Sequence, residues 1–126
     1  MNDIKALIVE DDFIIKMFLE QLITGKGCEV ISTYDSGEAL LSDIANVEPS
    51  LIFMDISLSG ELNGIEVASA LKENNKIPIV FVTGNKDILD GVDLKKHNVI
   101  HIINKPITEV GFNLEYEVIL KKLSTL

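Results

Sequence analysis

Residues 51–55 read Leu-Ile-Phe-Met-Asp, an apolar run that ends at an acidic residue. A short apolar run bounded by polar residues is typical of a strand buried on both faces of a sheet. The same pattern recurs at three other places: Glu10-Asp11-Asp12 follow residues 4–9, Thr83 follows residues 79–82, and Lys105-Pro106 follow residues 99–103. In an open parallel sheet, ligands bind outside the carboxyl ends of the strands. The four strand ends therefore predict one site that gathers carboxylates, a hydroxyl and an ammonium, as a cation and a phosphoryl group require.

Strand and helix patterns alternate five times along the chain. Strands are predicted at residues 4–9, 28–33, 50–54, 78–82 and 99–103, and helices at residues 12–25, 36–46, 63–74, 85–96 and 107–124. This alternation indicates parallel pairing, right-handed crossovers and helices on both faces of one sheet. The helix at 85–96 is expected to be the least stable, because Asp87, Asp90, Gly91 and Asp93 are poor helix formers.

The composition indicates a single globular domain over residues 1–126. Apolar residues make up 47% of the chain and charged residues 25%, which argues against disorder. The net charge of −9 argues against binding to nucleic acid or to an anionic membrane. Cys28 is the only cysteine, so no disulfide framework is expected. Neither a signal peptide nor a membrane span of ~18–20 apolar residues is found, and we expect a cytoplasmic protein.

The ordered motifs resemble the receiver domain of two-component response regulators over essentially the whole chain. The resemblance rests on the acidic pair Glu10-Asp11, then Asp55, Thr83 and Lys105-Pro106, in that order. It implies an α/β fold of the (βα)5 doubly wound type, a flavodoxin-like three-layer sandwich with a five-stranded parallel sheet in the order 2-1-3-4-5. It also implies a phosphoacceptor signalling domain, not an enzyme, whose partner is a sensor histidine kinase or a histidine phosphotransfer protein. A homodimer formed on phosphorylation is a further expectation.

The resemblance implies a role for each site residue. Asp55 is the expected nucleophile that takes a phosphoryl group from a phosphohistidine. Positioning and charge neutralisation dominate such a transfer, and Lys105 and Thr83 are expected to contact the phosphoryl oxygens. Two carboxylates ~4 Å apart repel by about 4 kcal/mol at an effective dielectric near 20, so a cation is needed, and Mg²⁺ prefers oxygen ligands. Its expected ligands are Asp11, Asp55, Glu10 (directly or through water) and, by resemblance, the backbone carbonyl of Ser57.

Three further residues have specific expectations. Asp12 is predicted to be the N-cap of the first helix instead of a metal ligand, because aspartate is a favoured cap. Ile102 stands three residues before Lys105, where receivers typically carry Tyr or Phe, so the usual threonine–aromatic switch is in doubt. His101 is a less favoured candidate to take part instead, since lone histidines usually pack or cap. The Lys105-Pro106 peptide bond is expected to be cis, by resemblance.

Three other functions fit the sequence less well. A haloacid-dehalogenase-type phosphatase needs a second Asp two residues after the nucleophile, where this chain has Ser57. A flavodoxin-like cofactor binder needs a glycine- or hydroxyl-rich loop after the first strand, and none is present. A receiver that signals by binding alone is disfavoured by the complete acidic pocket. The first helix is apolar on more than one face, which suggests either deep burial or the docking of a phosphotransfer partner through Ile14, Ile15 or Phe18.

Overall fold

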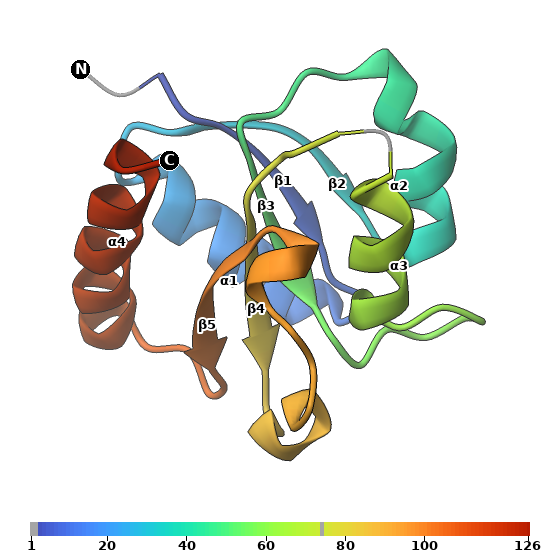
Figure 1. The fold of residues 1–126 in the computed structure, drawn as a ribbon. Helices are drawn as coiled ribbons and strands as arrows, with labels where there is room; N and C mark the ends of the chain where they lie inside the picture. The colour runs from blue at the N-terminus through green and yellow to red at the C-terminus, as the bar shows by residue number, and fades with distance from the viewer. Residues whose placement is uncertain (1–2, 74) are drawn as a thin grey trace.

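The computed structural model describes residues 3–73 and 75–126, which form one five-stranded sheet with helices on both faces (Figure 1). The strands are β1 (Lys5–Val9), β2 (Glu29–Tyr34), β3 (Leu51–Asp55), β4 (Ile79–Thr83) and β5 (Val99–Asn104). They are all parallel, in the order β2-β1-β3-β4-β5. The predicted strand order and flavodoxin-like architecture are confirmed.

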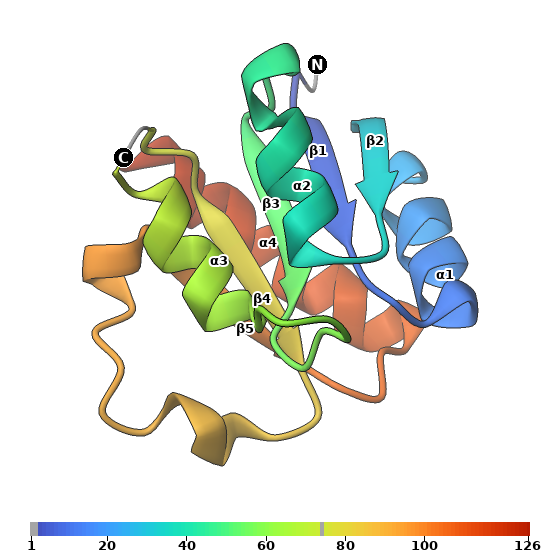
Figure 2. The same cartoon turned by 90° about the vertical axis from the view of Figure 1, so that its right-hand side faces the viewer.

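The helices divide into two layers, as Figure 2 shows. Helices α1 (Phe13–Thr24) and α4 (Glu109–Ser124) cover one face of the sheet, and α2 (Gly37–Asp43) and α3 (Gly64–Leu71) cover the other. Alternate residues of each strand enter different cores: Ala6 and Ile8 pack toward α1 and α4, whereas Leu7 and Val9 pack toward α2 and α3. Strands β3 and β4 are buried along their whole length, as their unbroken apolar runs predict.

The predicted helix at 85–96 is wrong. The structure has two short 3-10 turns there, η2 (Lys86–Leu89) and η3 (Lys95–His97), joined by an irregular segment. Gly91 lies between them with φ +80°, a left-handed conformation that no α-helix contains. The aspartates and the glycine therefore prevent an α-helix here, instead of only making it less stable. Only Leu89 of η2 is buried, so little apolar contact offsets their poor helix propensity.

The other helices lie where the sequence places them, with shorter ends. The predicted helix at 36–46 is α2 followed by a 3-10 turn, η1 (Ile44–Asn46). The one predicted at 63–74 ends at Leu71, and residue 74 lies outside the described residues. Asp12 is the N-cap of α1, as predicted, and its Oδ1 accepts hydrogen bonds from the N–H groups of Ile14 and Ile15 at 3.0 and 3.1 Å.

Candidate functional site

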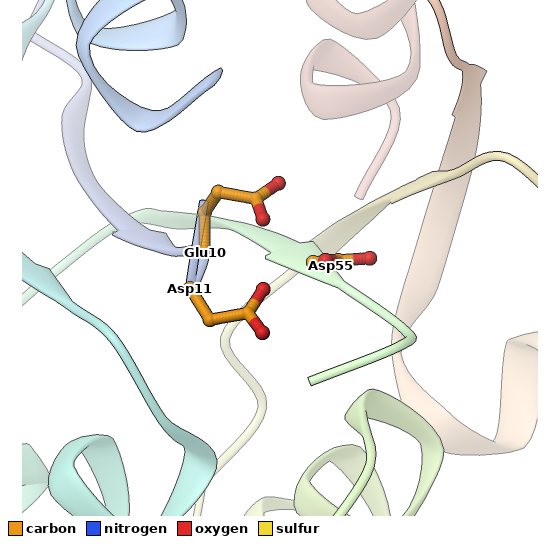
Figure 3. A group of neighbouring side chains, drawn as sticks. All are labelled: Glu10, Asp11 and Asp55. Carbon is orange, nitrogen blue, oxygen red and sulfur yellow. The ribbon is translucent and has the colours of Figure 1, made fainter. Parts of the chain in front are cut away.

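The acidic cluster is formed by the ends of two neighbouring strands. Val9 of β1 pairs with Met54 of β3, so the residues that follow, Glu10 and Asp55, come out at the same edge of the sheet. Carboxylate oxygens of Glu10, Asp11 and Asp55 lie within 4.8 Å of one another. Figure 3 shows the Glu10 and Asp11 side chains turned toward the side on which Asp55 lies. Glu10 and Asp55 are only 1% and 4% exposed, whereas Asp11 is exposed.

Lys105 extends from the end of β5 into this cluster. Its Nζ lies 3.1 Å from Glu10 Oε1 and 3.3 Å from Asp55 Oδ2, and it donates a hydrogen bond to the latter. The backbone N–H of Lys105 donates to the carbonyl of Thr83 at 2.8 Å, which ties the end of β5 to the end of β4. The peptide bond between Lys105 and Pro106 is cis, as expected. The structure thus brings together the four charged side chains that the sequence predicts.

Thr83, the last residue of β4, is fully buried. Its Oγ1 accepts a hydrogen bond from the Asn85 N–H at 3.0 Å and donates to the Asn85 carbonyl at 3.3 Å. The hydroxyl is therefore bonded to its own loop, and no hydrogen bond joins it to a carboxylate of the acidic cluster among the described residues. It lies one position beyond Val82, which pairs with Asp55 across β3 and β4. A reorientation of the side chain would be needed before the hydroxyl could contact a group on Asp55.

Two backbone N–H groups of the loop after β3 also belong to the site. The N–H of Ser57 donates to Asp55 Oδ1 at 3.0 Å, and the N–H of Ser59 donates to Asp11 Oδ2 at 3.1 Å. The sequence patterns do not identify Ser59. Its contribution comes from the main chain, so no side-chain pattern marks it. The predicted role of the Ser57 carbonyl as a metal ligand stays a prediction.

Gly64 allows α3 to begin directly against the end of β3. A Cβ on this residue would lie 2.5 Å from the carbonyl oxygen of Asp55 and 2.9 Å from the Cα of Ile56. Both of these atoms belong to the backbone and cannot rotate away, so only glycine fits. The Gly64 N–H in turn donates to the Ile56 carbonyl at 2.8 Å. The close approach fixes the backbone on which Asp55 stands.

Burial and neighbouring charges change the ionisation of Glu10, Lys105 and Asp11. Burial raises the pKa of Glu10 from 4.5 to about 7, and the neighbouring Asp55 carboxylate adds to the effect. Burial also opposes the charge on Lys105, but contacts with Glu10 and Asp55 outweigh it and raise the lysine pKa. For Asp11, the burial effect is outweighed by contacts with Glu10 and Ser59, and its pKa falls below 3.8. Near neutral pH, Glu10 therefore exchanges a proton while Asp11 stays ionised.

The donor set fits a magnesium ion. Three carboxylates face one ammonium, so the cluster keeps an excess of negative charge when all are ionised. Oε1 of Glu10 is buried and, although it lies 3.1 Å from Lys105 Nζ, it has no hydrogen-bond partner among the described residues. A buried oxygen without a hydrogen bond is costly, and a cation would satisfy it. Hard oxygen donors of this kind suit Mg²⁺.

The two unusual residues of β5 point to opposite faces. Ile102 is half-buried and packs with the core under α2 and α3. His101 faces α4, where its Nε2 lies 2.8 Å from Glu115 Oε1 and its Nδ1 lies 3.0 Å from Lys122 Nζ. The histidine is thus engaged with α4, in line with the simpler expectation that it packs or caps. Its participation in a switch stays a prediction.

A family model for the response regulator receiver domain matches residues 6–113. The match covers most of the chain and includes every site residue named above, so the chain belongs to the response regulator receiver domain family. This is a family of signalling domains that act in two-component systems. Among residues 3–73 and 75–126, no helix is both long and apolar enough to cross a bilayer.

Known relatives agree with this assignment. An 85-residue stretch is 34% identical to protein-glutamate methylesterase/protein-glutamine glutaminase 4 of Geobacter metallireducens, covering 67% of this chain and 24% of the relative. A stretch of 86 residues is 34% identical to the uncharacterized transcriptional regulatory protein YrkP of Bacillus subtilis, covering 68% of this chain and 36% of that relative. The chain therefore matches only about a quarter to a third of the length of these proteins.

A solved structure gives the same fold. The signal receiver domain of a modulated diguanylate cyclase from Desulfovibrio desulfuricans G20 superposes with a TM-score of 0.82 at 26% sequence identity, covering 98% of both chains. The likeness extends over the whole sheet and its helices.

The raised pKa of Glu10 predicts a pH-dependent stability in the absence of divalent cations. The folded state holds the Glu10 proton up to about pH 7, whereas the unfolded chain releases it near 4.5. This stabilisation is fully present below pH 4.5 and is lost as the pH rises through 7. One pKa unit corresponds to 1.36 kcal/mol, so the free energy of unfolding from Glu10 should fall by about 2–3 kcal/mol across this window.

Urea unfolding in EDTA at pH 5, 6, 7 and 8 measures this fall. Glu10→Gln is the control, because the amide cannot titrate and its curve should be flatter. Asp11 does not interfere, since its lowered pKa places its own transition below 3.8. Equal slopes for the two proteins would show that Glu10 is ionised throughout and that burial does not raise its pKa.

Proposed function

We propose that this receiver domain accepts a phosphoryl group on Asp55 from a phosphohistidine. The observation that carries the proposal is that one buried carboxylate, Asp55, lies 3.3 Å from the Lys105 ammonium and within 4.8 Å of carboxylate oxygens of Glu10 and Asp11. The ammonium favours the charged form of this buried acid, and the carboxylates together can hold a cation. Lys105 and such a cation would then neutralise charge on the oxygens of a transferred phosphoryl group.

The transfer is written as one displacement at phosphorus. An oxygen of the Asp55 carboxylate forms the new P–O bond as the P–N bond to the donor imidazole breaks, and the imidazole leaves with the bonding electron pair. Lys105 Nζ lies 3.3 Å from Asp55 Oδ2 before the transfer. After the transfer it would contact a phosphoryl oxygen, to which the negative charge has moved. The N–H of Ser57, which donates to Asp55 Oδ1 at 3.0 Å, would hold the orientation of the carboxylate.

Magnesium, when bound by Glu10, Asp11, Asp55 and the Ser57 carbonyl, would supply positive charge to the carboxylates and to one phosphoryl oxygen. The protein's own contribution is to hold these ligands together against their repulsion. Asp11 is ionised and exposed, and thus ready to bind a cation, whereas Glu10 first releases a proton near neutral pH. Thr83 would contact another phosphoryl oxygen after leaving its bonds to Asn85. Gly84 leaves room for the group, since a Cβ there would meet only the Lys105 Cβ, at 3.9 Å.

The chain itself is proposed to be a signalling domain without a substrate of its own, and to act in the cytoplasm. The phosphatase alternative has nothing to support it, because Ser57 stands where such an enzyme needs its second aspartate, and its side chain is exposed. A homodimer formed on phosphorylation stays a prediction. The phosphoryl donor, a sensor histidine kinase or a histidine phosphotransfer protein, also stays a prediction.

Phosphorylation of Asp55 is tested by incubating the chain with acetyl phosphate and Mg²⁺ and measuring the intact mass. One phosphoryl group per chain is expected, and it should be lost at alkaline pH, as acyl phosphates are. Asp55→Asn should abolish the labelling, because an amide is not a nucleophile. Asp12→Asn is the matched control, since Asp12 caps α1 and should not be modified. Labelling that persists in Asp55→Asn would place the acceptor elsewhere.

The surface beside the site offers a docking place for the phosphohistidine partner. On α1, Phe13, Ile14 and Met17 are 63%, 71% and 43% exposed. A groove of about 200 Å³ runs from α1 to the loop after β5, lined by Ile14, Ile15, Phe18, Lys105, Pro106 and Ile107. Of the three residues proposed from the sequence, Ile14 is exposed, and Ile15 and Phe18 are half-buried. Exposed apolar anchors next to the reacting residue are typical of transient interfaces.

Ile14→Asp should slow phosphotransfer from a phosphohistidine protein by about tenfold or more, because it places a charge in the apolar contact. Labelling by acetyl phosphate needs no docking surface and should stay within about twofold of the wild type. Leu114→Asp introduces the same charge at a similarly exposed position on α4 and should change neither rate. A parallel loss of both reactions in Ile14→Asp would indicate damage to the fold instead of to docking.

A further inference from the structure

The loop between β3 and α3 is held by three carboxylates. The N–H groups of Ser57, Ser59 and Leu62 donate to Asp55 Oδ1, Asp11 Oδ2 and Glu38 Oε1 at 3.0, 3.1 and 3.2 Å. Two of these acceptors belong to the acidic cluster. The third, Glu38, comes from the first turn of α2 and belongs to no part of the site described so far.

Glu38 is well placed to hold this loop. Its helix is fixed to the protein by Leu40, which is fully buried in the same core as Val67 of α3. Its carboxylate also lies over the backbone of Gly60: a Cβ on that residue would be 2.6 Å from Glu38 Oε2. Gly60 has φ +103°, a conformation that favours glycine. The loop therefore meets Glu38 at two places, the Leu62 N–H and the bare backbone of Gly60.

The three hydrogen bonds differ in what happens to them during the reaction. Asp11 and Asp55 are the proposed metal ligands, and Asp55 is the proposed phosphoryl acceptor, so the bonds from Ser59 and Ser57 are altered when the site is used. The bond to Glu38 is not, because this carboxylate lies outside the cluster. It is the anchor that can hold the loop in every state of the site.

We propose that Glu38 is a positioning residue that orders the β3–α3 loop and thereby sets the affinity of the acidic cluster for a divalent cation. An ordered loop presents the Ser57 main chain and holds Asp11 in place, whereas a loose loop must be ordered when the cation binds. That ordering has an entropic cost, which lowers the affinity. The part that concerns the cation rests on the proposed function; the ordering of the loop does not.

The experiment compares Glu38→Ala with Glu38→Gln, which removes the charge but keeps an oxygen that can accept from the Leu62 N–H. Amide hydrogen exchange at Ser59 and Leu62 is measured in EDTA, and the Mg²⁺ dissociation constant is measured by titration. Glu61→Ala is the control, since it removes the same charge from an exposed position in the same loop. Gly60→Ala perturbs the same contact, because its new Cβ would lie 2.6 Å from Glu38 Oε2, and it also strains the loop backbone at φ +103°.

In Glu38→Ala and Gly60→Ala, amide exchange at Leu62 should be faster than in the wild type. The Mg²⁺ affinity should be weaker by about 3- to 10-fold, because only a part of the free energy of a hydrogen bond to a charged acceptor is lost from cation binding. Glu38→Gln and Glu61→Ala should stay within about twofold of the wild type. Unchanged exchange in Glu38→Ala would overturn the proposal, as would faster exchange with unchanged Mg²⁺ affinity. Equal losses in Glu38→Gln and Glu38→Ala would also overturn it, since the charge and not the bond would then matter.

Failure of the proposed function gives a different result. If the wild-type chain does not bind Mg²⁺, the cation site is wrong, and the role of Glu38 in its affinity falls with it. The exchange measurement in EDTA then still decides whether Glu38 orders the loop. The two failures are therefore distinguishable from the same set of proteins.

Discussion

Repulsion between the carboxylates at the carboxyl edge of the sheet is the constraint on which the rest of the structure depends. Glu10, Asp11 and Asp55 lie within 4.8 Å of one another, and two of them are almost fully buried. Each such pair repels by about 4 kcal/mol at a dielectric near 20. The Lys105 ammonium offsets part of this repulsion, and a proton on Glu10 offsets another part near neutral pH. The apolar strands behind the cluster supply the stability that keeps the charges together.

The sheet and the charged residues of the site could be predicted from the sequence because both depend on local patterns. The apolar run at 51–54 buries both faces of β3, and a polar residue directly after such a run has to emerge at the edge of the sheet. The hydrogen bonds of the site could not be predicted in this way. Ser59 acts through its backbone N–H, and Glu38 reaches Leu62 from a different helix, 24 residues away in sequence. The predicted helix at 85–96 is absent because Gly91 takes a left-handed conformation and the aspartates around it are poor helix formers.

The segment between β4 and β5 changes how a signal could leave the site. The Thr83 hydroxyl is bonded to Asn85, at the start of this segment, and no α-helix follows to make it rigid. Ile102 on β5 provides no aromatic ring to follow a movement of the threonine. On the opposite side of Asp55, by contrast, the β3–α3 loop is tied to α2 through Glu38. If Asp55 is phosphorylated as proposed, we therefore expect the movement to occur on the Thr83 side, where less structure opposes it.

The most direct test of this account is the Mg²⁺ affinity of Lys105→Ala. Lys105 is taken to serve the phosphoryl group, and its ammonium competes with a dication for the charge of Glu10 and Asp55. Lys86→Ala removes a positive charge at an exposed position of η2 and corrects for net charge. Titration in parallel should give Lys105→Ala a dissociation constant equal to that of Lys86→Ala, or up to about tenfold lower, since 1.4 kcal/mol of relieved repulsion corresponds to tenfold. A dissociation constant several-fold higher for Lys105→Ala would contradict the account, because it would make the lysine part of the metal site.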